Sequence, residues 1–353
     1  MSSYSSNNLL LFLTKLVEAI LYNYNAEEMP VVNETADVYD PIIVTHDIFV
    51  RTCCHIDDER EELELILTYN MQWNDSRLQF YDYNGKIPYL QFINSSKIWT
   101  PHTYFSNEVD GKFYDILKPN SLIRIYPNGE VKLSGKVSLT LSCPIDFRYF
   151  PKHTFECALK IANGNTINEL FFKWKKENEI QVTKSLTQRR YSLRKVDADI
   201  CHVHSMSSTE SYTCLRAIFT FDSIDSIYWR HIYKPCAMLL LISFVTLWIY
   251  SEHWKSRIFI SLISFALFVI KISFTENEIP KRSYSTSHDY WSFWATFLSF
   301  FTAVESIIVC SIKYRIMTTG EHVGKHVNVE WTAMKHGRMP ELKSEMYARQ
   351  YQS

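Results

Sequence analysis

The apolar stretch at residues 258–274 reads IFISLISFALFVIKISF and carries a single charge, on Lys271. A helix of about 20 such residues crosses the ~30 Å hydrocarbon core of a bilayer. Two further apolar runs flank this stretch, at residues 236–250 and 291–312. Each run alone could be a buried helix of a soluble protein, but three in close succession favour a membrane. The sequence therefore predicts three spans, at about 232–250, 257–274 and 290–312.

The polarity of the chain changes at the first of these spans. The residues before it mix polar and apolar side chains, and several Lys and Arg residues follow the third span. Because basic residues concentrate in cytoplasmic segments, we expect residues 1–231 to form an extracellular domain. Residues 232–314 would be a transmembrane domain in contact with membrane lipid, and residues 315–353 a cytosolic tail. The net charge of −1 leaves no basic excess for a nucleic-acid partner.

The cysteines and the possible glycosylation sites also agree with an extracellular location. Six of the eight cysteines lie before the first span. Six cysteines allow 15 pairings, so spacing alone leaves their connectivity open. The adjacent Cys53 and Cys54 are interpreted as two thiols or a local bridge rather than a metal site. Glycosylation acceptor triplets begin at Asn33, Asn74 and Asn94.

The extracellular part has the pattern of an antiparallel β-sandwich that follows one N-terminal helix. Runs rich in β-branched and aromatic residues occur at residues 64–73, 121–125, 131–141 and 218–221. Between them lie the turn dipeptides Asn84-Gly85, Asp110-Gly111 and Asn128-Gly129. Leucines between Leu9 and Leu21 recur at helical spacing and predict an amphipathic helix. A signal peptide is the alternative, although no basic segment precedes the leucines.

A loop enclosed by two cysteines and several shorter motifs occur in a defined order along the chain. Residues 143–157 read CPIDFRYFPKHTFEC, with thirteen residues between the cysteines. We call this segment the signature loop, because it resembles that of the Cys-loop ligand-gated ion channels, with Asp146, Phe150 and Pro151 at the family's positions. Further family-like segments are found at residues 48–58, 73–78, 98–108, 211–214 and 279–284. The resemblance covers about residues 22–314.

The resemblance implies a fold, an assembly and a location. It implies a homo- or hetero-pentamer at the plasma membrane, at neuronal or postsynaptic sites, which a small extracellular ligand opens. It pairs Cys143 with Cys157 and Cys201 with Cys214. The second pair is similar to the glycine-, GABA- and glutamate-gated chloride-channel branch, of which this chain would be a divergent, invertebrate-like member. No cofactor is implied.

In the family the second span lines the pore, and the periodicity of this span gives candidate pore residues. With Arg257 at the inner mouth, a stripe with alternating steps of four and three runs through Phe259, Ile263, Ala266, Ile270, Ser273 and Asn277. Rings of Phe259 and Ile263 would exclude water and ions at rest. The acidic ring of cation-selective relatives has no counterpart before Arg257, which favours anion selectivity.

The family's ligand pocket lies between two subunits. Tyr104 and Tyr212 fall at two positions of its aromatic box, although they could be ordinary residues at the sandwich edge. The loop that usually adds an aromatic reads Ala162-Asn-Gly-Asn-Thr166 and offers only Asn163. On the opposite face, Asn70 replaces the arginine that clamps amino-acid carboxylates. The other residues expected on that face are Thr68, Lys132 and Ser134.

The family couples ligand binding to the pore through the signature loop and the segment around Pro280. Here His153 stands where the family has an aspartate, and Ser223 where it has an arginine. We expect His153 to be an ordinary surface histidine, although it could titrate near neutral pH.

The end of the chain and the absence of enzyme motifs complete the prediction. Residues 315–353 are too polar to form a fourth span. This leaves a second interpretation, a membrane-tethered binding or assembly subunit that does not conduct. Enzyme classes are excluded because the sequence has no GxGxxG, GxxxxGK[ST], GxSxG or HExxH motif. His202 and His204 flank Val203 beside Cys201, which the resemblance assigns to a disulfide, so no metal site is expected.

Overall fold

A computed structural model describes residues 2–31, 40–85, 87–93, 95–114, 120–183, 190–204, 211–276, 279 and 282–335. The described residues cluster into two units. The first comprises Met1–Asp225 together with Pro280–Thr286, and the second comprises Ser226–Ile279 and Ser287–Ser353.

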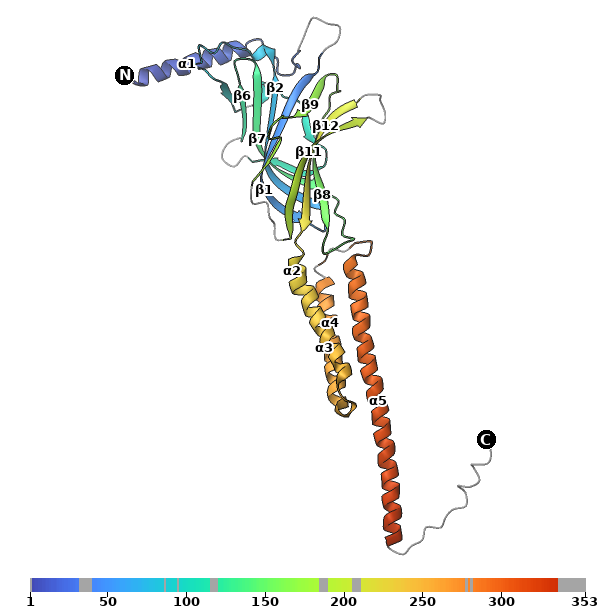
Figure 1. The fold of residues 1–353 in the computed structure, drawn as a ribbon. Coiled ribbons are helices and arrows are strands. Elements are labelled where there is room, and N and C mark those ends of the chain that lie inside the picture. The colour runs from blue at the N-terminus through green and yellow to red at the C-terminus, as the bar shows by residue number, and fades with distance from the viewer. Residues whose placement is uncertain are drawn as a thin grey trace. The chain divides into compact units, whose positions relative to one another are not determined.

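The first unit contains an N-terminal helix and two β-sheets (Figure 1). The helix α1 covers Ser2–Leu21, as the leucine spacing predicts. The eight-stranded sheet consists of β1 (Ile42–Asp57), β2 (Glu62–Asn74), β3 (Leu90–Phe92), β5 (Glu108–Phe113), β6 (Ser121–Ile125), β7 (Glu130–Ser142), β9 (Leu170–Trp174) and β10 (Ile180–Val182). The four-stranded sheet consists of β4 (Thr103–Phe105), β8 (Thr154–Asn163), β11 (Tyr191–His204) and β12 (Ser211–Ser223). Short 3-10 turns lie at Ser76–Leu78 and Ser95–Lys97.

Alternation of apolar and polar side chains builds the core of this unit. In β2 every second residue is buried, from Leu63 to Trp73. Successive side chains of a strand point to opposite faces, so one face of β2 packs inward and the other remains accessible. Parts of β7 and β8 show the same alternation and add further residues to this core.

The sheets depart from the predicted pattern in two places. The strand β1 pairs in parallel with β9 and β10, so the larger sheet is mixed rather than purely antiparallel. Asp110-Gly111 lies inside β5, beside a register shift, and is not a turn. Asn128-Gly129 does join β6 to β7, and Gly129 has φ +83°.

The second unit contains three helical segments long and apolar enough to cross a membrane, as the sequence predicts. The first runs over Ser226–Trp248 and includes α2 (Ser226–Tyr228), a π-helical turn (Trp229–Tyr233) and α3 (Lys234–Val245). The second is α4 (Trp254–Glu276), and the third is part of α5 (Ser287–Lys335). Phe268 of α4 is fully buried against Cys236 of α3 and Ala295 of α5.

Candidate functional site

A groove of about 260 Å³ lies on the larger sheet, where β2, β6 and β7 are neighbours. Three residues predicted for the ligand pocket, Asn70, Lys132 and Ser134, line it together. Strand register explains this, because Asn70 lies opposite Ser134 in the β2–β7 pair. The fourth predicted residue, Thr68, is outside the groove, and its hydroxyl accepts a hydrogen bond from Nε of Arg51 at 2.6 Å.

The groove also contains charged residues that sequence reasoning missed. Asp47 of β1 accepts a hydrogen bond from the Asn70 amide at 2.7 Å and lies 3.8 Å from the ammonium group of Lys175. Arg124 of β6 is the register partner of Lys132. The pairing of Asp47 with Asn70 across β1 and β2 could have suggested the first of these residues.

Two of the groove cations lie over aromatic rings. The ammonium nitrogen of Lys132 is 4.7 Å from the ring centre of Tyr126 and 2.8 Å from the Glu130 carboxylate. The guanidinium carbon of Arg124 is 5.1 Å from the ring centre of Tyr89. At exposed sites each such contact stabilises the cation by only about 1 kcal/mol, so little free energy is lost when the side chain moves away. Both side chains are therefore available to an incoming anionic group.

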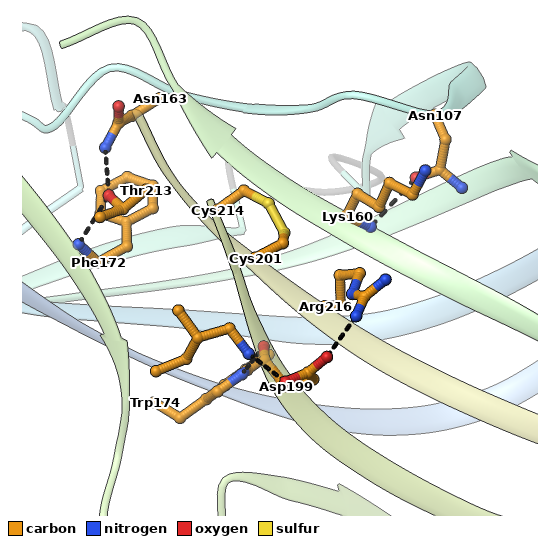
Figure 2. The surroundings of a disulfide bond; sticks show 11 residues. Asn107, Lys160, Asn163, Phe172, Trp174, Asp199, Cys201, Thr213, Cys214 and Arg216 are labelled. Carbon is orange, nitrogen blue, oxygen red and sulfur yellow. Dashed lines mark hydrogen bonds and ion pairs between the residues drawn. A yellow bond between two sulfur atoms is a disulfide. The ribbon is translucent and has the colours of Figure 1, made fainter. Parts of the chain in front are cut away.

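The residues predicted for the aromatic side of the pocket lie on the other sheet. Tyr104 of β4 is 43% exposed and its hydroxyl donates to the Asn163 carbonyl oxygen at 3.4 Å. Tyr212 is half-buried on β12. The Asn163 side chain, in contrast, is buried and donates to the hydroxyl of Thr213 at 3.2 Å (Figure 2). Asn163 thus serves the core at this point rather than an open pocket.

Two disulfides join the elements around these residues. Cys143 is bonded to Cys157, and Cys201 to Cys214, the two pairs that the resemblance implies. Cys201 and Cys214, whose bond Figure 2 shows, are also register partners in the β11–β12 pair. Tyr212 lies two residues before Cys214. This bond joins β11 and β12 close to the end of the strand pair that carries Tyr212.

The signature loop packs its aromatic residues inward and exposes its charges. Phe147 and Phe150 are buried. Asp146 is exposed and forms an ion pair of 2.7 Å with Arg148, and this hydrogen-bonded guanidinium holds the pKa of Asp146 below its ordinary value. Pro151 follows Phe150 and its carbonyl oxygen accepts a 2.6 Å hydrogen bond from the hydroxyl of Ser223.

His153 is buried, so the expectation of an ordinary surface histidine is wrong. Its backbone amide donates to the Ser223 hydroxyl at 3.1 Å, and the Ser223 amide donates to the His153 carbonyl at 3.0 Å. The two positions at which the family has charges therefore meet here through neutral hydrogen bonds. The surrounding aromatic side chains explain the burial, since Phe147, Phe150 and Tyr191 all contact the imidazole.

The segment at residues 282–286 contacts the signature loop within the first unit. The hydroxyl of Tyr284 accepts a hydrogen bond from the Phe147 amide at 3.0 Å. Arg282 lies over the Phe147 ring at 4.4 Å, forms an ion pair of 2.7 Å with Glu61, and donates to the carbonyl of Asp58. Pro280, predicted to take part in this coupling, lies outside the described residues.

In the second span, the predicted pore stripe lies on the side of α4 that faces away from the other helices. Phe259, Ile263 and Ile270 are exposed, as are Ala266 and Ser273. The opposite side, which includes Ser261, Ser264, Phe268 and Ile272, is buried. Asn277 lies outside the described residues.

Arg257 departs from the stripe. Its guanidinium is 2.6 Å from the Glu305 carboxylate of α5, and only 7% of its side chain is exposed. This contact orients the start of α4 against α5 and compensates two charges that would be costly in hydrocarbon.

Among the predicted glycosylation sites, Asn74 is exposed at the end of β2. Asn33 and Asn94 lie outside the described residues.

A β-sheet domain with a disulfide-closed loop, followed by three helices long and apolar enough to cross a membrane, defines a multi-pass membrane protein. Residues 13–223 match the neurotransmitter-gated ion-channel ligand binding domain. The chain therefore belongs to the neurotransmitter-gated ion-channel family, which is not a family of enzymes. It is 36% identical to a glutamate-gated chloride channel of Drosophila melanogaster over 253 residues, 71% of this chain. The chain spans 55% of the length of that relative.

Proposed function

We propose that this chain is one subunit of a pentameric channel at the plasma membrane of neurons, opened by an extracellular ligand. The ligand would bind between two subunits, with the groove of β2, β6 and β7 on one side and Tyr104 and Tyr212 of the neighbour on the other. The observation that carries this proposal is the separation of these two groups on different sheets of the chain. One copy alone therefore offers two half-sites.

The charges in the groove indicate the class of ligand. Arg124, Lys132 and Lys175 outnumber the single acidic side chain in its lining, Asp47. Asn70 offers no bidentate clamp, and its amide already donates to Asp47. We propose that Lys132 leaves Glu130 to contact an anionic group of the ligand as a point charge, which is less geometrically selective than an arginine fork.

The pore of this assembly would be lined by α4 and would select anions. The exposed stripe from Phe259 to Ser273 is apolar over its inner part. A ring of such side chains excludes ions until it widens. The similarity to a chloride channel and the absence of an acid between Trp254 and Phe259 both support anion selectivity.

The proposal is tested by recording currents in oocytes that express the chain alone or with a related subunit. Candidate transmitters that carry a carboxylate, beginning with glutamate and glycine, are applied at known surface expression. We expect chloride currents, and Lys132→Gln should raise the half-activating concentration by about tenfold, as loss of one charge-assisted contact of about 1.4 kcal/mol predicts.

Lys136→Gln is the matched control, because Lys136 lies on the same strand over Tyr114 and outside the groove. Equal shifts in both variants would contradict the assigned ligand groove. Surface assemblies that never conduct, with any partner, would instead favour the tethered, non-conducting subunit.

A further inference from the structure

A buried group of titratable side chains lies behind the signature loop. The imidazole of His153 is only 5% exposed, and its Nε2 lies 3.4 Å from the hydroxyl of Tyr191. That hydroxyl donates to the Asp58 carboxylate at 2.7 Å. The other oxygen of Asp58 accepts a hydrogen bond from Arg190 at 3.1 Å. His153, Tyr191 and Asp58 thus form a continuous chain of polar contacts inside an aromatic cluster.

The second ring nitrogen of His153 makes this arrangement sensitive to protonation. Nδ1 is buried and has no hydrogen bond of good geometry among the described residues. Protonation converts both ring nitrogens into donors and adds a charge. A buried donor without a full partner costs about 1–3 kcal/mol, and more when it is charged. The arrangement therefore tolerates the neutral ring and opposes the cation.

The groups that face His153 act in opposite directions. Burial, the dominant effect, lowers the pKa of His153 below its ordinary value of 6.5. The charges of Asp58 and Asp146 and the carbonyl of Pro151 raise that pKa in part. Asp146 is already paired with Arg148, and Arg282 is held by Glu61 over the Phe147 ring. Asp58 is therefore the buried carboxylate that a proton on His153 would meet.

We propose that His153 is a proton-binding site through which acid loosens the contact between the signature loop and the end of β12. The contact is direct, because the His153 backbone exchanges hydrogen bonds with Ser223, and the Ser223 hydroxyl donates to Pro151. The protonated imidazole is attracted to Asp58 and can donate a hydrogen bond to the Pro151 carbonyl oxygen. It then competes with the Ser223 hydroxyl for that carbonyl oxygen.

The direction of the pH effect follows from linkage. The loosened state, with a solvated ring, binds the proton at the ordinary pKa, whereas the packed state binds it only at lower pH. The packed state is therefore fully stable above pH 6.5 and loses stability as the pH falls below that value.

Hydrogen exchange of the full chain in lipid nanodiscs tests the proposal without any need for conduction. Exchange of peptides that cover residues 147–153 and 221–225 is measured between pH 7.5 and 5.5 and corrected for the intrinsic rate. We expect at least a threefold increase at the acidic end in the wild type. His153→Phe, which keeps an aromatic ring but cannot titrate, should show no increase.

His55→Phe is the control, because His55 is exposed on β1 of the same unit. It should behave as the wild type does. Asp58→Asn keeps the titrating ring but removes a charge that favours the proton in the packed state. The pKa of His153 in the packed state then falls further below that of the loosened state, so the increase in exchange should begin at higher pH than in the wild type. This variant also decides the matter if His153→Phe does not fold. A flat wild-type profile, an equal increase in His153→Phe, or an increase in Asp58→Asn that begins at the same or a lower pH than in the wild type would each overturn the proposal.

Discussion

At the residue scale, Thr213 shows how one hydroxyl organises the end of the smaller sheet. It is fully buried, and its oxygen accepts hydrogen bonds from the Asn163 amide and from the backbone N–H of Phe172, each at 3.2 Å (Figure 2). These contacts connect β8, β9 and β12 directly beneath the disulfide hairpin.

Thr213→Val keeps the shape of this side chain but leaves two buried donors without an acceptor. We expect the variant to lower the free energy of unfolding by about 1–3 kcal/mol for each unpaired donor. The thermal unfolding midpoint of the purified full chain measures the effect. Thr213→Ser, which retains the hydroxyl, is the control and should lose much less. Equal losses in the two variants would show that packing of the methyl group, rather than the hydrogen bonds, is what matters.

Residue type and spacing predicted which residues of the larger sheet lie together, but not the direction of every side chain. Asn70, Lys132 and Ser134 alternate along two paired strands, so their common groove followed from periodicity. The side chain of Asn163 is buried because it donates a hydrogen bond to the Thr213 hydroxyl, and that of His153 because it packs against aromatic rings such as Phe147. Thr213 and Tyr191 are distant in sequence from these two residues. Phe147 and Phe150 are close to His153 in sequence, but no periodic pattern in the loop shows the direction of its side chain.

At the element scale, the β6–β7 hairpin depends on a single glycine. Gly129 has φ +83°, and a Cβ atom added there would lie 2.7 Å from the carbonyl oxygen of Asp75. Both the left-handed backbone and the close contact disfavour any side chain. The turn therefore holds Lys132 and Arg124 in register at the groove.

Gly129→Ala should destabilise the chain by about 1–3 kcal/mol and lower its thermal unfolding midpoint. Gly135→Ala in β7 provides the comparison. Its Cβ would meet only the Phe113 ring at an ordinary 3.5 Å, and its φ is not left-handed. There, alanine should be neutral or stabilising by up to about 1 kcal/mol. Indistinguishable midpoints for the two variants would argue against strain at the turn.

Strand periodicity predicted elements well where one face is buried and the other accessible. The run at residues 121–125 is β6 itself, and the run at 64–73 lies within β2. The parallel pairing of β1 with β9 and β10 could not be predicted in this way. Both parallel partners of β1 lie more than a hundred residues further along the chain. The alternation of apolar and polar residues within a strand does not show which distant strand will be its neighbour.

At the scale of the whole molecule, hydropathy predicted the three spans but not their ends. The first span begins at Ser226 and passes through a π-helical turn that contains Arg230 and His231, and α5 continues past the apolar run to Lys335. Polar residues continue a helix as readily as apolar ones. Hydropathy therefore predicts the apolar part of a helix, which can lie in the bilayer, but not where the helix begins and ends.

The proposed five-fold assembly predicts a difference between two residues of α4 that a single subunit does not show. Ile263 and Leu262 are adjacent on α4 and equally exposed, at 42% each. Only the five-fold arrangement would distinguish them, with Ile263 towards the pore and Leu262 towards lipid or a neighbouring subunit.

In a conducting assembly, formed with a partner subunit if one is required, Ile263→Ser should raise the resting leak severalfold, because a hydrated ring no longer excludes ions. Leu262→Ser, at matched surface expression, should leave the leak at the wild-type level. Voltage clamp without agonist provides the comparison. Since the two side chains differ only in direction around the helix, equal leaks would mean that the stripe does not face the pore. The heptad assignment of α4 would then have to be rotated or abandoned.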